Sequence, residues 1–202
     1  MTIRGKVIKH RVLPPATCLM PLPVVLATCR SAAGKDNIIT IAWTGVVCSD
    51  PPMISIAVRP SRFSHELLAQ NGDFVANLPS AGTMVHADLC GTLSGRDRDK
   101  FAEAGWTPIG ASQVNAAIIK ECPVALECRT RKKLSLGSHD LFLAEVLAVQ
   151  AHEELLDANG RLDIEAIEPL AFCPNCKGVG QYWSLKEALG HYGVSKEHHK
   201  RV

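Results

Sequence analysis

The segment VVLATCRSAAGKDNIITIAWTGVVCSDPPMISIAV, residues 24–58, contains three short runs that are rich in β-branched residues. Val24–Cys29 and Ile38–Trp43 are separated by a loop of small and polar residues, which predicts a hairpin and antiparallel pairing of the two strands. A turn with two prolines starts at Asp50, and Met53–Val58 follows it as a third strand. These runs predict an antiparallel sheet.

More strands than helices follow this segment. Ser61 is a candidate N-cap for a helix that runs to about Gln70 and ends at Asn71-Gly72. The other expected elements are strands at Phe74–Leu78, Val124–Arg131 and Leu141–Ala151, and short helices near residues 84–89 and 99–104. Six or more strands with only a few short helices predict a mainly β fold, a β-barrel or sandwich with helical decorations.

The length of 202 residues fits one domain with an appendage. Residues 1–172 are expected to form the domain, and residues 173–202 a C-terminal extension with a Cys-x-x-Cys pair, a short helix and a basic tail. A capping box at Ser184–Glu187 predicts that helix. An apolar fraction of 47% with 21% charged residues excludes global disorder, collagen and coiled coil. The net charge of +2 is too small to make nucleic acid a default partner.

The apolar stretch at residues 18–29 follows several basic residues, as in a secretion signal. Prolines at positions 14, 15, 21 and 23 break the helix that a signal peptide forms. No run approaches the roughly eighteen apolar residues that a membrane-spanning helix needs. We therefore expect a cytoplasmic protein without a membrane partner.

Eight cysteines in 202 residues are too few for a disulfide scaffold, so reduced thiols are expected. Cys173-Pro174-Asn175-Cys176 has the spacing of one metal knuckle, in which two thiolates turn toward one ion. A tetrahedral site needs two further ligands, and the sequence holds no second pair at this spacing. A metal site at Cys173 and Cys176, a redox-active dithiol and an inert surface loop all remain open, and no metal ligand is assigned.

The stretch Arg59-Pro60-Ser61-Arg62-Phe63-Ser64-His65 places two guanidinium groups and two hydroxyls between a strand end and a helix start. Helix N-termini present unpaired N–H groups, hydroxyls add donors, and arginine can grip two phosphate oxygens, so a phosphate would suit this position. A solvated loop with a serine cap is the alternative. The sequence contains neither G-x-G-x-x-G after a strand nor a P-loop. FMN fits a barrel with such a loop, because it offers a phosphate to the helix start and a flat ring to an apolar wall.

Several motifs then resemble, in order, the flavin reductase-like proteins of the FMN-binding split-barrel superfamily, and among them the flavoredoxin branch. The motifs are Asp36–Gly45, Ser49–Ile56, Arg59–His65, Phe74–Leu78, Cys90-Gly91 with Ser94–Asp97, Lys100-Phe101, and Gly137–Phe142. The resemblance covers about residues 20–172 and implies an FMN-binding split barrel, usually a homodimer whose cofactor site includes residues of both chains.

The resemblance also implies roles for individual residues. The isoalloxazine wall corresponds to Trp43, Thr44, Val47, Cys48, Ser49 and Asp50, and the phosphate grip to Ser61, Arg62 and Ser64 with Arg59 alongside. Asn77 matches an asparagine near the ribityl chain and ring, and Cys90, Ser94 and Lys100 match a segment close to the flavin. Tyr182 and Trp183 could cover the flavin or pack on the barrel.

His139 is the catalytic candidate. A lone histidine in a strand-rich protein is often a structural hydrogen-bonding residue. Relatives carry a histidine after a glycine-rich turn near the reactive face of the flavin, where it could position nicotinamide or relay a proton.

The resemblance implies NAD(P)H-dependent hydride transfer to FMN, with onward electron transfer to free flavin, ferric iron or a protein partner. One alternative is a flavoredoxin-type electron carrier without efficient NAD(P)H oxidation. Another is a pyridoxamine phosphate oxidase-like activity on the same architecture, whose phosphate-binding pattern is not evident in the sequence.

Overall fold

The computed structural model describes residues 2–3, 6–175 and 178–195. Its main element is a seven-stranded antiparallel sheet with the order β5-β4-β8-β11-β12-β7-β6. These strands are β4 (Val25–Arg30), β5 (Asp36–Ile41), β6 (Thr44–Ser49), β7 (Pro52–Val58), β8 (Asp73–Leu78), β11 (Val124–Ser135) and β12 (Asp140–Ala151).

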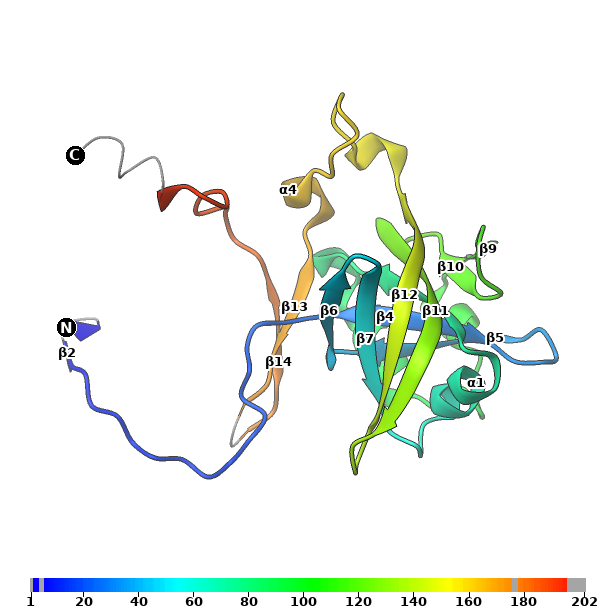
Figure 1. The fold of residues 1–202 in the computed structure, drawn as a ribbon, viewed down its shortest axis with the longest axis horizontal. Helices are drawn as coiled ribbons and strands as arrows, with labels where there is room; N and C mark the ends of the chain where they lie inside the picture. Colours follow the sequence, from blue (N-terminus) through cyan, green and yellow to red (C-terminus); the bar gives the residue numbers. More distant parts are fainter. Residues whose placement is uncertain (1, 4–5, 176–177, 196–202) are drawn as a thin grey trace.

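β5 and β6 lie at opposite edges of this sheet, although only Ala42 and Trp43 separate them in the chain. The sheet must therefore curl until its edges approach each other, which makes an open barrel (Figure 1). The Ala57 N–H donates to the Trp43 carbonyl oxygen at 2.9 Å and holds this crossing against β7. The mainly β fold with helical decorations is confirmed.

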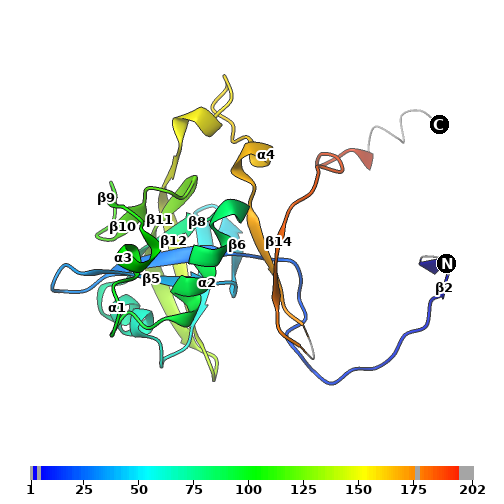
Figure 2. The same ribbon diagram turned by 180° about the vertical axis from the view of Figure 1, so that it is seen from behind.

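The short helices cover the β4–β5 side of the barrel, as Figure 2 shows from behind. They are α1 (Phe63–Asn71), η1 (Ala81–Thr83), α2 (Met84–Thr92) and α3 (Lys100–Ala104), and the hairpin of β9 (Pro108–Gly110) and β10 (Ala117–Ile119) lies beside them. Beyond β12 follow η2 (Glu153–Leu155) and α4 (Ile164–Ile167).

β4 is buried on both faces, which explains why its sequence is a continuous apolar run. Val25 and Ala27 belong to the core cluster that lies between α1 and the sheet, together with Phe74 and Phe142. Leu26, on the other face, belongs to the cluster under α2 and α3. The barrel wall therefore separates two apolar cores.

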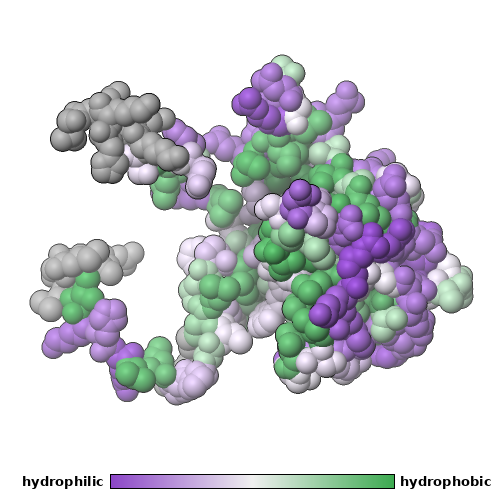
Figure 3. All heavy atoms as spheres, viewed as in Figure 1, coloured by the Kyte–Doolittle hydropathy of each residue, from purple (hydrophilic) through white to green (hydrophobic). Residues whose placement is uncertain are grey.

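A second sheet stands beside the barrel with the order β14-β13-β3 (Figure 1). It is formed by β3 (Leu22–Pro23), β13 (Leu170–Cys173) and β14 (Gln181–Ser184). The segment before β3, which includes β1 (Thr2–Ile3) and β2 (Lys6–Val7), and the segment after β14 both project from the body, and apolar residues recur along them (Figure 3). Val12, Leu19, Leu189 and Tyr192 are among their exposed apolar side chains.

Several sequence expectations are wrong in detail. Arg62, rather than Ser61, is the N-cap of α1, and it makes no side-chain capping bond. No helix starts at Ser184, because this residue ends β14 and residues 185–191 have no regular structure. The boundary expected after residue 172 lies within β13, and the division of the chain into a domain and an extension stays a prediction.

Among the described cysteines, six carry free thiols, whereas Cys18 is disulfide-bonded, so the expectation of reduced thiols is wrong at that residue. Cys173 is one of the free thiols. Cys176 lies outside the described residues, so the structure does not decide between a metal site, a redox-active dithiol and an inert loop at this pair. No group of three metal-ligating side chains is found within the described part of the chain. None of the helices described is long and apolar enough to cross a membrane.

Candidate functional site

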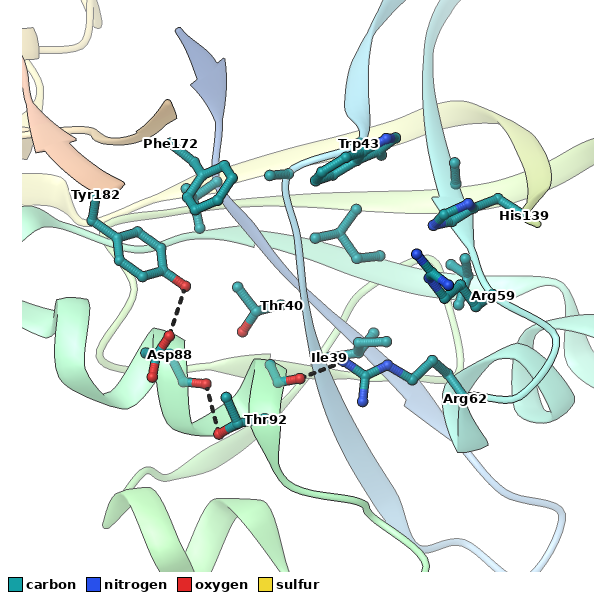
Figure 4. Close-up of a pocket in the computed structure, with 16 residues that line it drawn as sticks. Ile39, Thr40, Trp43, Arg59, Arg62, Asp88, Thr92, His139, Phe172 and Tyr182 are labelled. Atoms are coloured by element: carbon teal, nitrogen blue, oxygen red, sulfur yellow. Dashed lines mark hydrogen bonds between the residues drawn. The ribbon is translucent and has the colours of Figure 1, made fainter. Parts of the chain in front are cut away.

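Two cavities lie side by side between the barrel wall and α2, and both are lined by Ile39 and Arg62. The larger cavity, of about 350 Å³, is drawn in Figure 4. The smaller cavity, of about 180 Å³, lies at the start of α1. Because they share a wall residue of β5 and the residue that precedes α1, the two cavities adjoin and are candidates for the two ends of one elongated ligand site.

The smaller cavity collects donors for an anion. Its polar lining comes from four places. Ser61, Arg62 and Ser64 lie at the start of α1, Ser94 in the loop after α2, Asn37 on β5 and Lys100 on α3. An Arg62 Nη2 atom donates to the Gly91 carbonyl oxygen at 2.5 Å, which orients the guanidinium group along α2. The Asn37 Nδ2 atom donates to Ser64 Oγ at 2.6 Å, and both side chains are buried.

Lys100 is a buried cation at the base of this cavity. Its Nζ atom donates to the carbonyl oxygens of Ile38 and Cys90, each at 2.7 Å. Burial, with a contribution from nearby Arg62, lowers the pKa of Lys100 to about 8. An ammonium group has three N–H donors, so one remains beyond the two carbonyl bonds.

Local sequence explains how these groups come together. Asp99 is the N-cap of α3 and accepts hydrogen bonds from the N–H groups of Phe101 and Ala102, which places Lys100 in the first turn. Gly95 allows the loop after α2 to touch β5, because a Cβ atom there would lie 1.9 Å from Asn37 Oδ1. The anion-binding groups are therefore held by the barrel and by two helix starts.

The larger cavity has flatter and more apolar walls. Ile39, Ile41 and Val58 contribute aliphatic surface from β5 and β7. At one end the rings of Trp43 and His139 lie parallel, with a centroid distance of 6.2 Å and an interplanar angle of 5° (Figure 4). Such a wall suits a planar ring.

His139 lies beside the exposed Arg59, and Ser138 Oγ is 2.9 Å from its Nδ1 atom. Partial burial and the charge of Arg59 lower the pKa of His139. The imidazole is therefore neutral near pH 7, with one nitrogen able to donate and the other able to accept a hydrogen bond.

The opposite end of the larger cavity is closed by Phe172 of β13 and Tyr182 of β14, whose rings meet edge to face at 5.4 Å. Tyr182 donates its O–H to Asp88 Oδ1 of α2 at 3.3 Å (Figure 4). Burial and the Asp88 carboxylate raise the pKa of Tyr182 to about 12. Trp183, by contrast, is 55% exposed, so only the first residue of the aromatic pair reaches the site.

Eight of the residues expected at the cofactor line this site. They are Trp43, Arg59, Ser61, Arg62, Ser64, Ser94, Lys100 and His139. The remaining ones lie elsewhere in this chain: Thr44, Val47, Cys48, Ser49, Asp50, Asn77 and Cys90 line neither cavity.

Physical reasons for the other placements are visible. Asn77 is fully buried in the core, where it donates to the Leu26 carbonyl oxygen and accepts from the Ile119 N–H. The hydroxyl of Thr44 donates to the Ser55 carbonyl oxygen of β7. Cys90 belongs to the core cluster under α2, and its carbonyl oxygen accepts a hydrogen bond from Lys100 Nζ.

Sequence reasoning missed Asn37, Asp88, Thr92, Phe172 and Tyr182 as lining residues, although Tyr182 was weighed as a cover. Asn37 lies within the Asp36–Gly45 motif, and its hydrogen-bond partner Ser64 was expected at the phosphate. Asn37 could therefore have been predicted from the sequence. Asp88 and Phe172 carry no local signal, because their place depends on the packing of α2 and β13 beside the barrel.

Comparison with known proteins agrees with this geometry. A sequence model described as the flavin reductase like domain matches residues 17–174. Flavoredoxin of Desulfovibrio vulgaris (Miyazaki F) is 29% identical, with a TM-score of 0.86 over 93% of this chain and 100% of that chain. Flavoredoxin from Methanosarcina acetivorans is 26% identical, with a TM-score of 0.84 over 94% and 99% of the two chains.

A more distant relative is the FMN reductase (NADH) RutF of Pseudomonas syringae pv. syringae, which is 26% identical over 55% of this chain and 62% of its own length. The matched domain spans the barrel, all but the last strand of the second sheet, and every residue that lines the two cavities except Tyr182. The fold is thus the split barrel that the sequence motifs predicted, and the chain belongs to the flavin reductase like domain family.

Proposed function

We propose that this protein binds FMN in the two joined cavities and reduces it with NAD(P)H, passing the electrons on to free flavin, ferric iron or a protein. The observation that carries this proposal is that the two cavities adjoin. Anion donors at one end and flat apolar walls at the other share Ile39 and Arg62.

The residues present fit FMN at both ends. A phosphate dianion suits the smaller cavity, because the Arg62 guanidinium, the buried Lys100 ammonium and three serine hydroxyls converge there. The ring suits the larger cavity, where aliphatic side chains of β5 and β7 lie between two aromatic pairs. The larger cavity falls within the range of roughly 300–1,000 Å³ that is usual for ligand sites.

The chain's own residues then have separable tasks. FMN, when bound, supplies the ring that accepts a hydride. Arg62 and Lys100 hold the phosphate, while β5 and Phe172 exclude water from one face of the larger cavity. His139 and Arg59 lie at the other end, where His139 can orient a nicotinamide amide or hold a proton, since it is neutral near pH 7.

The test is a visible spectrum followed by stopped-flow mixing. We expect the purified protein to take up FMN and to show paired flavin bands, which bleach rapidly when NADH or NADPH is added. Protein that stays colourless after incubation with FMN would overturn the proposal. The FMN reductase (NADH) named above supports the choice of donor.

An electron carrier is the second candidate, and the structural likeness to two flavoredoxins favours it. In that case FMN binds but neither nucleotide bleaches it at a useful rate, and a reduced redox protein does so instead. The same stopped-flow experiment separates the two functions.

We further propose a homodimer as the working form. Both terminal segments project from the body with exposed apolar side chains, which include Val12, Leu19, Leu189 and Tyr192, and a second copy would cover them. Sedimentation velocity on the full chain tests this, and a monomer at micromolar concentration would contradict it. We also propose a cytoplasmic location, which the six free thiols among the described cysteines favour, although Cys18 is disulfide-bonded.

A further inference from the structure

Asp140 is buried beside the site without lining it. It is the first residue of β12 and follows His139 directly. Its Oδ2 atom lies 2.8 Å from His65 Nε2 of α1 and 3.2 Å from Lys133 Nζ of β11. One carboxylate thus joins a helix and two strands.

The carboxylate is held in its charged form by these partners. The hydrogen bond from His65, with a second one from Ser135, holds the pKa of Asp140 at about 2. The His65 ring also packs edge-on against Phe142, two residues further along the same face of β12, at a centroid distance of 5.5 Å. His65 therefore contacts β12 at two successive positions.

The residue before Asp140 points to the other side of the strand, because neighbouring side chains alternate. This residue is His139, whose ring lies parallel to Trp43 at the larger cavity. The loop that carries it is a tight turn, closed by the Leu136 N–H and the His139 carbonyl oxygen at 2.9 Å. Leu136 is 61% exposed, and Gly137 and Ser138 are exposed as well, so this turn has no apolar anchor of its own.

Helix α1, by contrast, is anchored independently of Asp140. Leu67 and Leu68 are buried in the core cluster under the sheet. Loss of the Asp140 contact should therefore release the turn and leave the start of α1, with its phosphate donors, in place.

We propose that Asp140, together with His65, is a positioning residue that fixes the start of β12, so that the His139 ring stays at the mouth of the larger cavity. The proposal rests on the flavin reductase function proposed above, since it assigns Asp140 to the hydride-transfer end of the site. It assigns no direct contact with FMN or with a nucleotide.

The first test compares Asp140→Asn with Glu145→Gln. Glu145 is the matched control, because it lies on the same strand and pairs with Arg131 at 2.8 Å. We expect Asp140→Asn to lower the limiting rate of FMN reduction by NADH by about tenfold to a hundredfold, as displaced catalytic groups do, with little change in the Kd for FMN. Glu145→Gln should change neither quantity.

The same change made in a His139→Gln protein distinguishes an effect on His139 from a general disturbance of the fold. In His139→Gln protein, a further Asp140→Asn change should leave the rate unaltered, because its effect passes through His139. An equal rate loss in both backgrounds, or no loss in the single variant, would overturn the proposal. If Asp140→Asn does not fold, His65→Leu takes its place and should lower the rate in the same way. His65→Gln keeps an N–H donor for Asp140, so it should restore the rate.

The pKa of His139, measured by NMR titration of the FMN-free protein, tests the proposal without any nucleotide. Removal of a neighbouring carboxylate alone would lower this pKa, whereas release of the ring from Arg59 into water would raise it. We expect a rise in Asp140→Asn and none in Glu145→Gln, and a fall would overturn the proposal. If wild-type protein binds FMN but neither nucleotide reduces it, the proposed function fails, and this titration still decides the role of Asp140.

Discussion

The smaller and the larger cavity differ in how their walls are held. In the smaller cavity Asn37, Ser64 and Lys100 are buried and bonded to each other or to backbone of the barrel. In the larger cavity the walls come from distant segments, and Trp43 is 40% exposed. A prearranged end gives affinity at low entropic cost, whereas an open end can admit a second reactant. We therefore expect substitutions at one end to change FMN binding and those at the other to change the reaction.

The largest effect is expected at Arg62. Arg62→Ala removes a charge-assisted grip on phosphate that is worth about 1.5–3 kcal/mol, so the Kd for FMN should rise by about tenfold to a hundredfold. Arg98→Ala is the control, because Arg98 pairs with Glu103 outside both cavities. Fluorescence titration of FMN gives both Kd values. If Arg62→Ala and Arg98→Ala raised the Kd for FMN equally, the smaller cavity would not be the phosphate site.

Gly95→Ala changes the smaller cavity by steric crowding. The new Cβ atom would lie 1.9 Å from Asn37 Oδ1, so Asn37 must move and its bond to Ser64 is strained. Such overpacking costs about 1–3 kcal/mol, which should appear as a lower Tm and as weaker FMN binding. Gly82→Ala is the control, since the nearest atom to a Cβ there, Ser80 Oγ, is 3.7 Å away. An unchanged Kd for FMN in Gly95→Ala would separate this loop from the binding site.

Lys100 makes the smaller cavity sensitive to pH. Its pKa is about 8 in the folded chain and ordinarily 10.5, so between these values the unfolded chain binds more protons and the contribution of this group to stability rises with pH. FMN binding should change in the opposite direction, because a neutral amine no longer offsets the phosphate charge. We expect weaker FMN binding at pH 9.5 than at pH 7 in the wild type. A pH response of the same size in Lys100→Met would contradict this assignment.

The smallest effect is expected at the aromatic end. Tyr182→Phe removes one hydrogen bond to the exposed Asp88 and keeps the ring that lines the cavity. We expect a loss of stability below about 1 kcal/mol and a Kd for FMN within about threefold of the wild type. Thermal unfolding and FMN titration check both, with Trp183→Phe as the exposed control. A larger loss of affinity would show that the second sheet, and not only the barrel, holds the cofactor.

The same contrast limits what sequence could reveal. Five of the six polar residues that line the smaller cavity were expected at the site, and Asn37 was missed. Ser61, Arg62 and Ser64 are close together in the sequence, and their hydrogen-bond donors indicate an anion site. Of the residues that line the larger cavity, only Trp43, Arg59, Arg62 and His139 were expected at the site. Its other wall belongs to β13 and β14, and no periodicity within residues 170–184 indicates which face of the barrel these strands cover.

Local patterns also failed where tertiary contacts decide. Ser184 and Glu187 have the spacing of a capping box, yet Ser184 is paired with Leu170 in β14. Thr44–Ser49 is β6, a strand that the local pattern did not predict, because its exposed Val46 and Val47 lack the apolar alternation of a half-buried strand. Asn77 also fits a family motif, and its amide is hydrogen-bonded to backbone groups of the core, so its role at the cofactor stays a prediction.

The pairing of β13 with β3 on one side and β14 on the other gives both ends of the chain a share in the larger cavity. Phe172 pairs with Leu22 and with Tyr182, so a deletion that reaches Leu22 or Tyr182 would leave its backbone with an unpaired edge. An affinity tag or a trimmed end, usually chosen for convenience in expression, is therefore expected to affect the larger cavity and the rates measured with this protein.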